Sequence, residues 1–261
     1  MISNPAARAF RPLHFPDQPD ALGAVAVPVA DHLVRRGLLA DGPRLTLAAG
    51  DPTDRLEDIR DALFRQSWIE PARREQMPVT AGPHGAELAR LDRSALRILG
   101  FWATKVHING LVGLGEPGGP SVWISRRSGR AASNPGRWDT LIAGGRAAGN
   151  SVEQTALQEG WEEAGVGPDL MESLHRVGEL AVQYVSPRGL HQEVLVICDL
   201  ALPDRFRAVC HDGEIEESIR LPVSELAARL ADPRVFKFSS YLVLTDLVAR
   251  HRGGCPASPG A

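Results

Sequence analysis

The chain has 261 residues, of which 43 % are hydrophobic and 23 % charged, a composition typical of a globular protein with one large or two modest domains. A formal net charge of -3 and an isoelectric point near 6.2 argue against a nucleic acid or an anionic membrane as partner, since both need strong positive charge. Three widely spaced cysteines without a CxxC pair argue against a disulfide framework or a zinc site. We therefore expect a cytoplasmic protein with no membrane span.

The pattern of residues 21–70 predicts helices. The stretches "VADHLVRRGLLA" and "DRLEDIRDALFRQ" repeat apolar residues at helical spacing, and Asp51 or Thr53 can cap the second helix. From "KVHINGLVGL" onward the pattern alternates as in strands, and "GEPGGP" separates this stretch from "SVWISRR". We therefore expect an accessory α/β domain over 1–104, a mixed α+β domain over 105–252 and a disordered tail over 253–261.

Further strands and helices are expected in the second domain. "RVGELAVQYVS" and "QEVLVICDLAL" predict two strands joined by "PRGLH". After the loop "CHDGEIEES", the stretch "IRLPVSELAARLA" predicts a short strand followed by a helix, and "SSYLVLTDLVARHR" predicts a last helix.

A glycine-rich loop and an acidic helix stand in the middle of the second domain, in "GGRAAGNSVEQTALQEGWEEAG". Ser151 and Gln154 form a capping-box pattern that begins the helix at Val152, and Gly165 is a stop signal. At about 100° of rotation per residue, two faces are expected. The apolar face comprises Leu157, Trp161 and Ala164, and the opposite face carries Glu159, Glu162 and Glu163.

Three carboxylates at this spacing repel one another, each pair by a few tenths of a kcal/mol on an exposed helix. A divalent cation with a preference for hard oxygen ligands, Mg²⁺ or Mn²⁺, would remove that repulsion. The glycines upstream, Gly144, Gly145 and Gly149, let backbone N–H groups approach a phosphate near a helix N-terminus. The alternative is an ordinary solvated acidic face.

This stretch resembles the Nudix hydrolase motif, G-x5-E-x7-R-E-U-x-E-E-x-G-U, in which U is a bulky aliphatic residue. The matching residues are Gly144, Glu159, Glu162, Glu163, Gly165 and Val166. Three positions depart: Asn150 replaces the first Glu, Gln158 the Arg and Gly160 the aliphatic residue. The missing Arg would remove a salt bridge that orients a metal-binding Glu.

The resemblance extends over roughly residues 20–250. Four stretches carry it: "ALRILGFWATKVHINGLV", "RRSGRAASNPGRWDTLIAGG", "YVSPRGLHQEV" and "DGEIEESIRLPVSEL…FKFSS". Together they resemble a Nudix subgroup with an extra N-terminal domain, related to the Nudix part of fungal thiamine pyrophosphokinase fusions. The resemblance implies a Nudix fold, a mixed sheet between helices. It also implies hydrolysis of thiamine diphosphate or its oxidised analogues, or of a nucleoside-diphosphate derivative. The sequence leaves open whether the protein is a monomer or homodimer.

The resemblance also implies roles for individual residues. Glu159, Glu162 and Glu163 would hold Mg²⁺, with a backbone carbonyl from Gly144 or Gly145. Glu214 is the candidate general base; it is equally explained as a solvated turn residue, and Glu159 or Glu163 could serve instead.

Six further residues are candidate substrate contacts. Positive charge near the loop would hold phosphate oxygens, and aromatic rings would stack on a heteroaromatic group. These candidates are Arg126, Arg127, Arg130, Trp138, Tyr184 and Glu193, each with a structural alternative. His107 and Asn109 are expected to be packed, structural residues.

Two rival functions stay open. One is a catalytically weak Nudix module that binds a metabolite as a regulator. The other is isomerase chemistry on the same fold, which would need a catalytic cysteine that neither Cys198 nor Cys210 obviously supplies.

Overall fold

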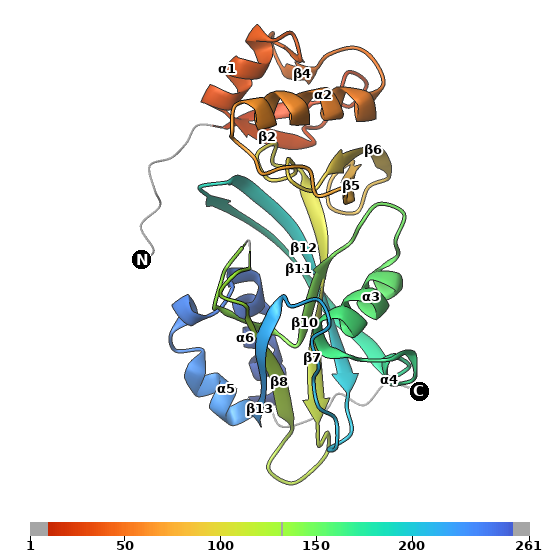
Figure 1. Ribbon diagram of the computed structural model, residues 1–261, viewed down its shortest axis with the longest axis vertical. Helices are drawn as coiled ribbons and strands as arrows, with labels where there is room; N and C mark the ends of the chain where they lie inside the picture. Colours follow the sequence, from red (N-terminus) through yellow and green to blue (C-terminus); the bar gives the residue numbers. More distant parts are fainter. Residues whose placement is uncertain (1–9, 132, 253–261) are drawn as a thin grey trace. The chain divides into compact units, whose positions relative to one another are not determined.

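The computed structural model describes residues 10–131 and 133–252 (Figure 1). The tail predicted over 253–261 lies outside this range. The described chain divides into two compact units, with one division between Thr104 and Lys105. The first unit also takes residues 146–150 and 181–194 from later in the chain, so neither unit is one continuous segment.

The first unit combines small sheets with two helices. One sheet has the order β2-β1-β4-β3 and another pairs β5 with β6. The strands are β1 (Phe10–His14), β2 (Gly23–Ala26), β3 (Leu39–Ala40), β4 (Leu45–Leu47), β5 (Gln76–Thr80) and β6 (Glu87–Asp92). Helices α1 (Val27–Arg35) and α2 (Pro52–Arg65) lie where the apolar spacing predicts them, and Asp51 caps α2 by accepting from the N–H groups of Thr53 and Asp54. Leu33, Leu56 and Leu63 are fully buried in the core of this unit.

A seven-stranded sheet organises the rest of the chain. Its order is β11-β12-β7-β8-β13, with β10 paired to β7 and β9 paired to β8. The strands are β7 (Trp102–Val112), β8 (Ser121–Arg127), β9 (Trp138–Thr140), β10 (Ile142–Gly145), β11 (Leu174–Ser186), β12 (Gly189–Ala201) and β13 (Ile215–Pro222). The division between the units falls within β7, β11 and β12.

Helices cover the sheet of the second unit. They are α3 (Val152–Ala164), α4 (Pro168–Met171), α5 (Val223–Arg229), the 3₁₀ turn η1 (Pro233–Val235) and α6 (Phe238–Arg252). Figure 1 shows α3 on one side of these strands and α5 and α6 on the other. Ile124, Leu226 and Leu244 are fully buried in the core that joins β8, α5 and α6. The fold is α+β with a sheet flanked by helices, and this confirms the predicted class.

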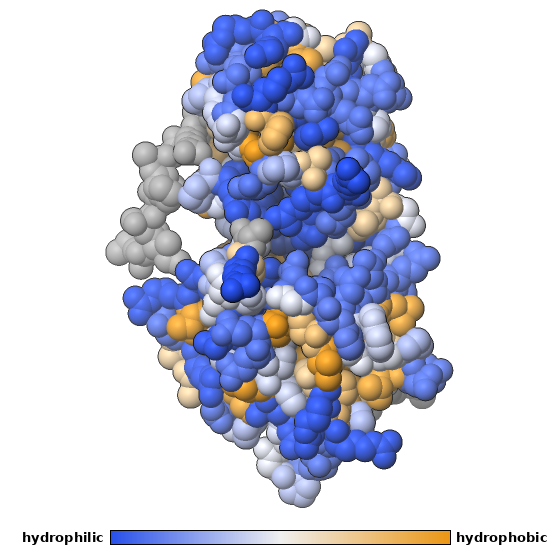
Figure 2. Space-filling view, in the orientation of Figure 1, coloured by the Kyte–Doolittle hydropathy of each residue, from blue (hydrophilic) through white to orange (hydrophobic). Residues whose placement is uncertain are grey.

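The surface is mainly hydrophilic in the view of Figure 2, with small separate apolar patches. Within the described ranges, no helix combines the length and the apolar character that crossing a membrane requires.

Candidate functional site

Helix α3 has the predicted ends. The Ser151 hydroxyl accepts from the Gln154 N–H at 3.1 Å, and the Gln154 side chain accepts from the Ser151 N–H at 2.7 Å. At the other end Gly165 adopts the left-handed conformation, with φ of 65°. Local capping residues therefore determine this helix, as the sequence indicated.

The buried face of α3 differs from the prediction. Leu157 and Trp161 are 42 % and 55 % exposed, so the expected Leu157–Trp161 core face is wrong. The helix instead buries Ala156, Gly160 and Ala164. These small residues let the helix lie close to its neighbours: a Cβ at Gly160 would overlap the terminal methyl of Met171.

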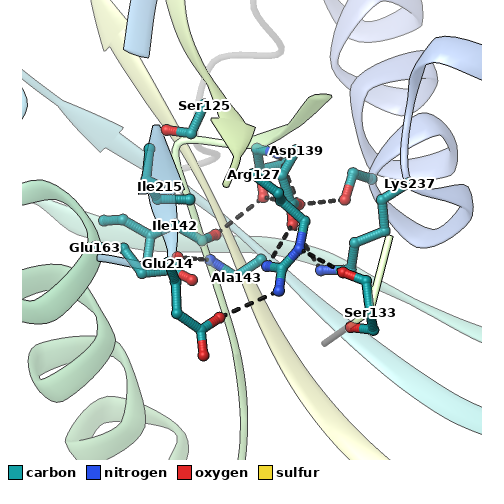
Figure 3. Close-up of polar contacts among 12 residues, drawn as sticks. Ser125, Arg127, Ser133, Asp139, Ile142, Ala143, Glu163, Glu214, Ile215 and Lys237 are labelled. Carbon is teal, nitrogen blue, oxygen red and sulfur yellow. Dashed lines mark hydrogen bonds and ion pairs between the residues drawn. The ribbon is translucent and has the colours of Figure 1, made fainter. Parts of the chain in front are cut away.

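The acidic side of α3 consequently faces the sheet. Glu163 is 3 % exposed, and its Oε2 accepts from the Ala143 N–H of β10 at 2.7 Å (Figure 3). The Glu159 carboxyl lies against Gly144, where an added Cβ would overlap it. Two of the three predicted ligands thus lie against the strand that also carries the predicted backbone ligands, Gly144 and Gly145.

The third glutamate, Glu162, has a different hydrogen-bond partner. Glu162 is partly exposed and accepts from the Gln158 side-chain amide at 3.0 Å. In residues 10–131 and 133–252, no three His, Cys, Asp or Glu side chains are grouped so that they could hold a metal ion.

Burial dominates the electrostatics of Glu163. It raises the pKa of this carboxyl well above its usual range, and the negative charges of Asp139 and Glu159 raise the pKa further. The Ala143 N–H acts in the opposite direction. The Lys237 ammonium also lowers the pKa, but burial and the two neighbouring carboxylates outweigh both effects, so the neutral form of Glu163 is favoured.

A buried charge network beside Glu163 was not predicted. Asp139 on β9 is 1 % exposed, lies 2.7 Å from the Lys237 ammonium and accepts from the Ser240 hydroxyl. Burial opposes ionisation of Asp139, but Lys237 and His107 hold its pKa far below the usual range. The sequence signal available was weak: Asp139 and Lys237 are 98 positions apart and meet only in the folded chain. His107 is fully buried and lies 3.0 Å from the Thr140 hydroxyl, the packed role expected for it.

The three candidate arginines have different surroundings. Arg127 is buried and lies 3.1 Å from a carboxylate oxygen of Glu214. Arg126 pairs with Glu216 and Glu217, and its guanidinium lies 6.0 Å from the centre of the Trp138 ring.

The protein itself thus supplies anionic partners for Arg126 and Arg127. The Arg130 side chain is exposed, and its own N–H donates to the Ser128 hydroxyl at 3.2 Å.

Glu214, the candidate general base, has a fixed backbone and an exposed carboxylate. Its carbonyl accepts from the Ser128 N–H at 2.8 Å, and its N–H donates to the Asp212 carboxylate at 2.8 Å. The side chain is 52 % exposed.

The segment before Glu214 is bonded to α3. The Val209 N–H donates to the Ala164 carbonyl at 3.1 Å, and the His211 N–H donates to the Glu162 carbonyl at 2.7 Å. The His211 ring also stacks on Trp161, with ring centres 4.5 Å apart.

Tyr184 and Glu193 lie together in the first unit. The Tyr184 hydroxyl is 3.4 Å from both carboxylate oxygens of Glu193, which is 2 % exposed. His191 stacks on Tyr184 with ring centres 4.3 Å apart, and its Nδ1 lies 3.4 Å from Glu193. Sequence reasoning missed His191, although its position two residues before Glu193 places both side chains on one face of β12.

Comparison with known proteins gives consistent matches. A family model described as "NUDIX domain" matches residues 110–242. "Nudix hydrolase 24, chloroplastic" from Arabidopsis thaliana is 31 % identical over 198 residues, which is 76 % of this chain and 54 % of the relative. "Nudix hydrolase 20, chloroplastic" from the same plant is 30 % identical over 219 residues, 83 % of this chain and 58 % of the relative. The chain thus spans little more than half the length of these relatives.

Among solved structures, the crystal structure of DR0079 from Deinococcus radiodurans matches with a TM-score of 0.49 and 20 % identity. The match covers 68 % of this chain and 99 % of that one.

Proposed function

This chain belongs to the Nudix family, and on that premise we propose that it is a Mg²⁺-dependent pyrophosphohydrolase that cleaves a diphosphate linkage. The observation that carries the proposal is the placement of Glu159 and Glu163 against β10, with Gly144 leaving room for a carboxyl group. Mn²⁺ has the same ligand preference and is an alternative ion.

The residues present fit such an ion. Carboxylates of Glu159, Glu162 and Glu163, with a carbonyl of Gly144 or Gly145, would supply oxygen donors only, the type that Mg²⁺ prefers. The Glu159 and Glu163 carboxyls lie against the same strand, β10, which supports a shared ion there. When bound, the metal would neutralise diphosphate oxygens and polarise the attacked phosphorus.

The protein's own groups would handle water and substrate. Glu214 would accept a proton from the attacking water, since its carboxylate is exposed. Glu163 is the weaker candidate base, because it is buried and bonded to the Ala143 N–H, and Glu159 stays an alternative. Arg130, with the paired Arg126, would supply positive charge for phosphate oxygens.

The substrate class rests on the sequence resemblance. We propose thiamine diphosphate or its oxidised analogues, with nucleoside-diphosphate derivatives as the second class. Trp138, Tyr184 and Glu193 stay candidate substrate contacts on the basis of the resemblance alone. The sparse cysteines, of which Cys198 and Cys210 are free thiols, support a reducing compartment such as the cytoplasm.

The test measures phosphate and monophosphate release from a panel of diphosphates with and without Mg²⁺. We expect turnover of at least one thiamine diphosphate analogue that requires the metal. Glu162→Gln and Glu163→Gln should each lower kcat by at least about 100-fold, as loss of an electrostatic catalytic group does. Unchanged turnover in both variants would exclude the metal site.

The second candidate function is a catalytically weak module that binds a metabolite and regulates. The bond from Gln158 to Glu162 favours it, because Gln158 stands where the family motif has an arginine. Submicromolar binding of a diphosphate ligand without Mg²⁺-dependent turnover would support this alternative.

A further inference from the structure

One buried guanidinium joins two loops to the sheet. Arg127 ends strand β8, and its side chain is 7 % exposed. Its Nε donates to the Ser133 carbonyl at 3.1 Å and its Nη2 to Glu214 at 3.1 Å, while Nη1 lies 3.7 Å from Asp139. Figure 3 shows the guanidinium between these three groups. The planar guanidinium of arginine carries five N–H donors and can make these contacts simultaneously. A lysine ammonium cannot donate hydrogen bonds in the same directions.

Asp139 does not need Arg127 for its neutralisation. The Lys237 ammonium lies 2.7 Å from the same carboxylate, and the Ser240 hydroxyl also donates to Asp139. The shorter ion pair of Arg127 is the one with Glu214.

Glu214 gains a defined carboxylate position from that pair. Its backbone is fixed at Ser128 and Asp212, but a half-exposed glutamate side chain on a loop has several rotamers available. The hydrogen bond from the buried Arg127 guanidinium excludes most of these rotamers.

We propose that Arg127 is a positioning residue that holds the Glu214 carboxylate ready to accept a proton from water. This inference rests on the proposed function, in which Glu214 is the general base. It replaces the phosphate contact expected of Arg127, because the guanidinium is buried and engaged by protein groups.

The experiment compares Arg127→Met and Arg127→Lys with the wild type, each alone and combined with Glu214→Gln. We expect Arg127→Met to lower kcat by about 10- to 100-fold with KM changed less than about twofold, since misplacement of a catalytic group by about 1 Å has this effect. Arg127→Lys should recover part of the loss. In the Glu214→Gln background, Arg127→Met should lower kcat by less than about twofold further, because both changes remove one function.

Arg220→Met is the matched control. Arg220 lies on β13 of the same sheet, and its ion-pair partner, Asp204, is exposed. The kcat and KM of the Arg220→Met variant should equal those of the wild type.

Two results would overturn the inference. One is an equal loss of kcat from Arg127→Met in both backgrounds, which would mean a purely structural role. The other is an unmoved Glu214 carboxylate in a crystal structure of Arg127→Met. Absence of turnover in the wild type would instead reject the proposed function, and the crystal structure would still decide whether Arg127 positions Glu214.

Discussion

At the scale of single residues, two glycines of α3 and β10 place different limits on side chains. A Cβ at Gly144 would overlap the Glu159 carboxyl, whereas a Cβ at Gly160 would meet the end of the flexible Met171 side chain. Gly144 therefore leaves room for a candidate site residue, whereas Gly160 leaves room only for a packed side chain.

Gly160→Ala should therefore raise the free energy of unfolding by about 1 kcal/mol, because alanine is the better helix former and the methyl of Met171 can rotate away. Urea denaturation measures this change, and phosphate release should stay at the wild-type rate. A loss of stability would show that Met171 has no other rotamer available.

Gly144→Ala is the counterpart of this substitution. It should leave the protein folded and reduce turnover, since it displaces Glu159 rather than a packing group.

At the scale of secondary-structure elements, α3 shows what the sequence could and could not predict. Its ends follow from Ser151, Gln154 and Gly165, which act on their own neighbours. Its buried face does not follow from the spacing of apolar residues, because the large apolar residues Leu157 and Trp161 are exposed. Close approach to β10 needs small residues, and hydrophobicity alone does not reveal that requirement.

The charge network that joins β7, β9 and α6 was likewise not predictable from local pattern. Asp139, Lys237 and His107 come from distant parts of the chain and meet only after the sheet has formed. Buried ion pairs of this kind cost desolvation, and removal of one partner leaves the other uncompensated.

Asp139→Asn should lower the free energy of unfolding by about 3–5 kcal/mol at neutral pH, because Lys237 would stay buried without its partner. The folded-state pKa of Asp139 lies below its unfolded value, so its contribution is present above about pH 4 and is lost as pH falls below that value. Chemical denaturation between pH 2 and pH 7, in wild type and variant, measures both effects.

The difference between the two proteins should shrink at the acidic end of that range. A difference that stays constant down to pH 2 would contradict the assigned role of Asp139. Asp204→Asn, at an exposed ion pair, serves as the control and should change stability little.

At the scale of the whole molecule, the sequence placed a boundary at 104/105, and one division between the units lies there. It gave no sign that residues 181–194 belong with the first unit. That membership depends on long-range contacts: Gly189 packs against the backbone of Arg97, and the Gln192 side chain donates to the Gly100 carbonyl at 2.5 Å. Local composition does not encode such contacts.

A fragment of residues 105–252 should therefore be less stable than the full chain by several degrees in Tm, because residues 181–194 would lose these partners and expose His191, Gln192 and Glu193. Calorimetry of both proteins measures the difference. Equal Tm values would mean that residues 181–194 contribute little to the fold.

Hydrogen bonds at both ends of the segment from Val209 to Glu214 restrict its motion. It is bonded at one end to the last turn of α3 and at the other to strand β8, through Ser128 and Arg127. A loop tied at both ends opens only by local unfolding, which is slower than the nanosecond fluctuation of a free loop. We therefore expect the Glu214 backbone to move together with the last turn of α3, which carries Glu162 and Glu163.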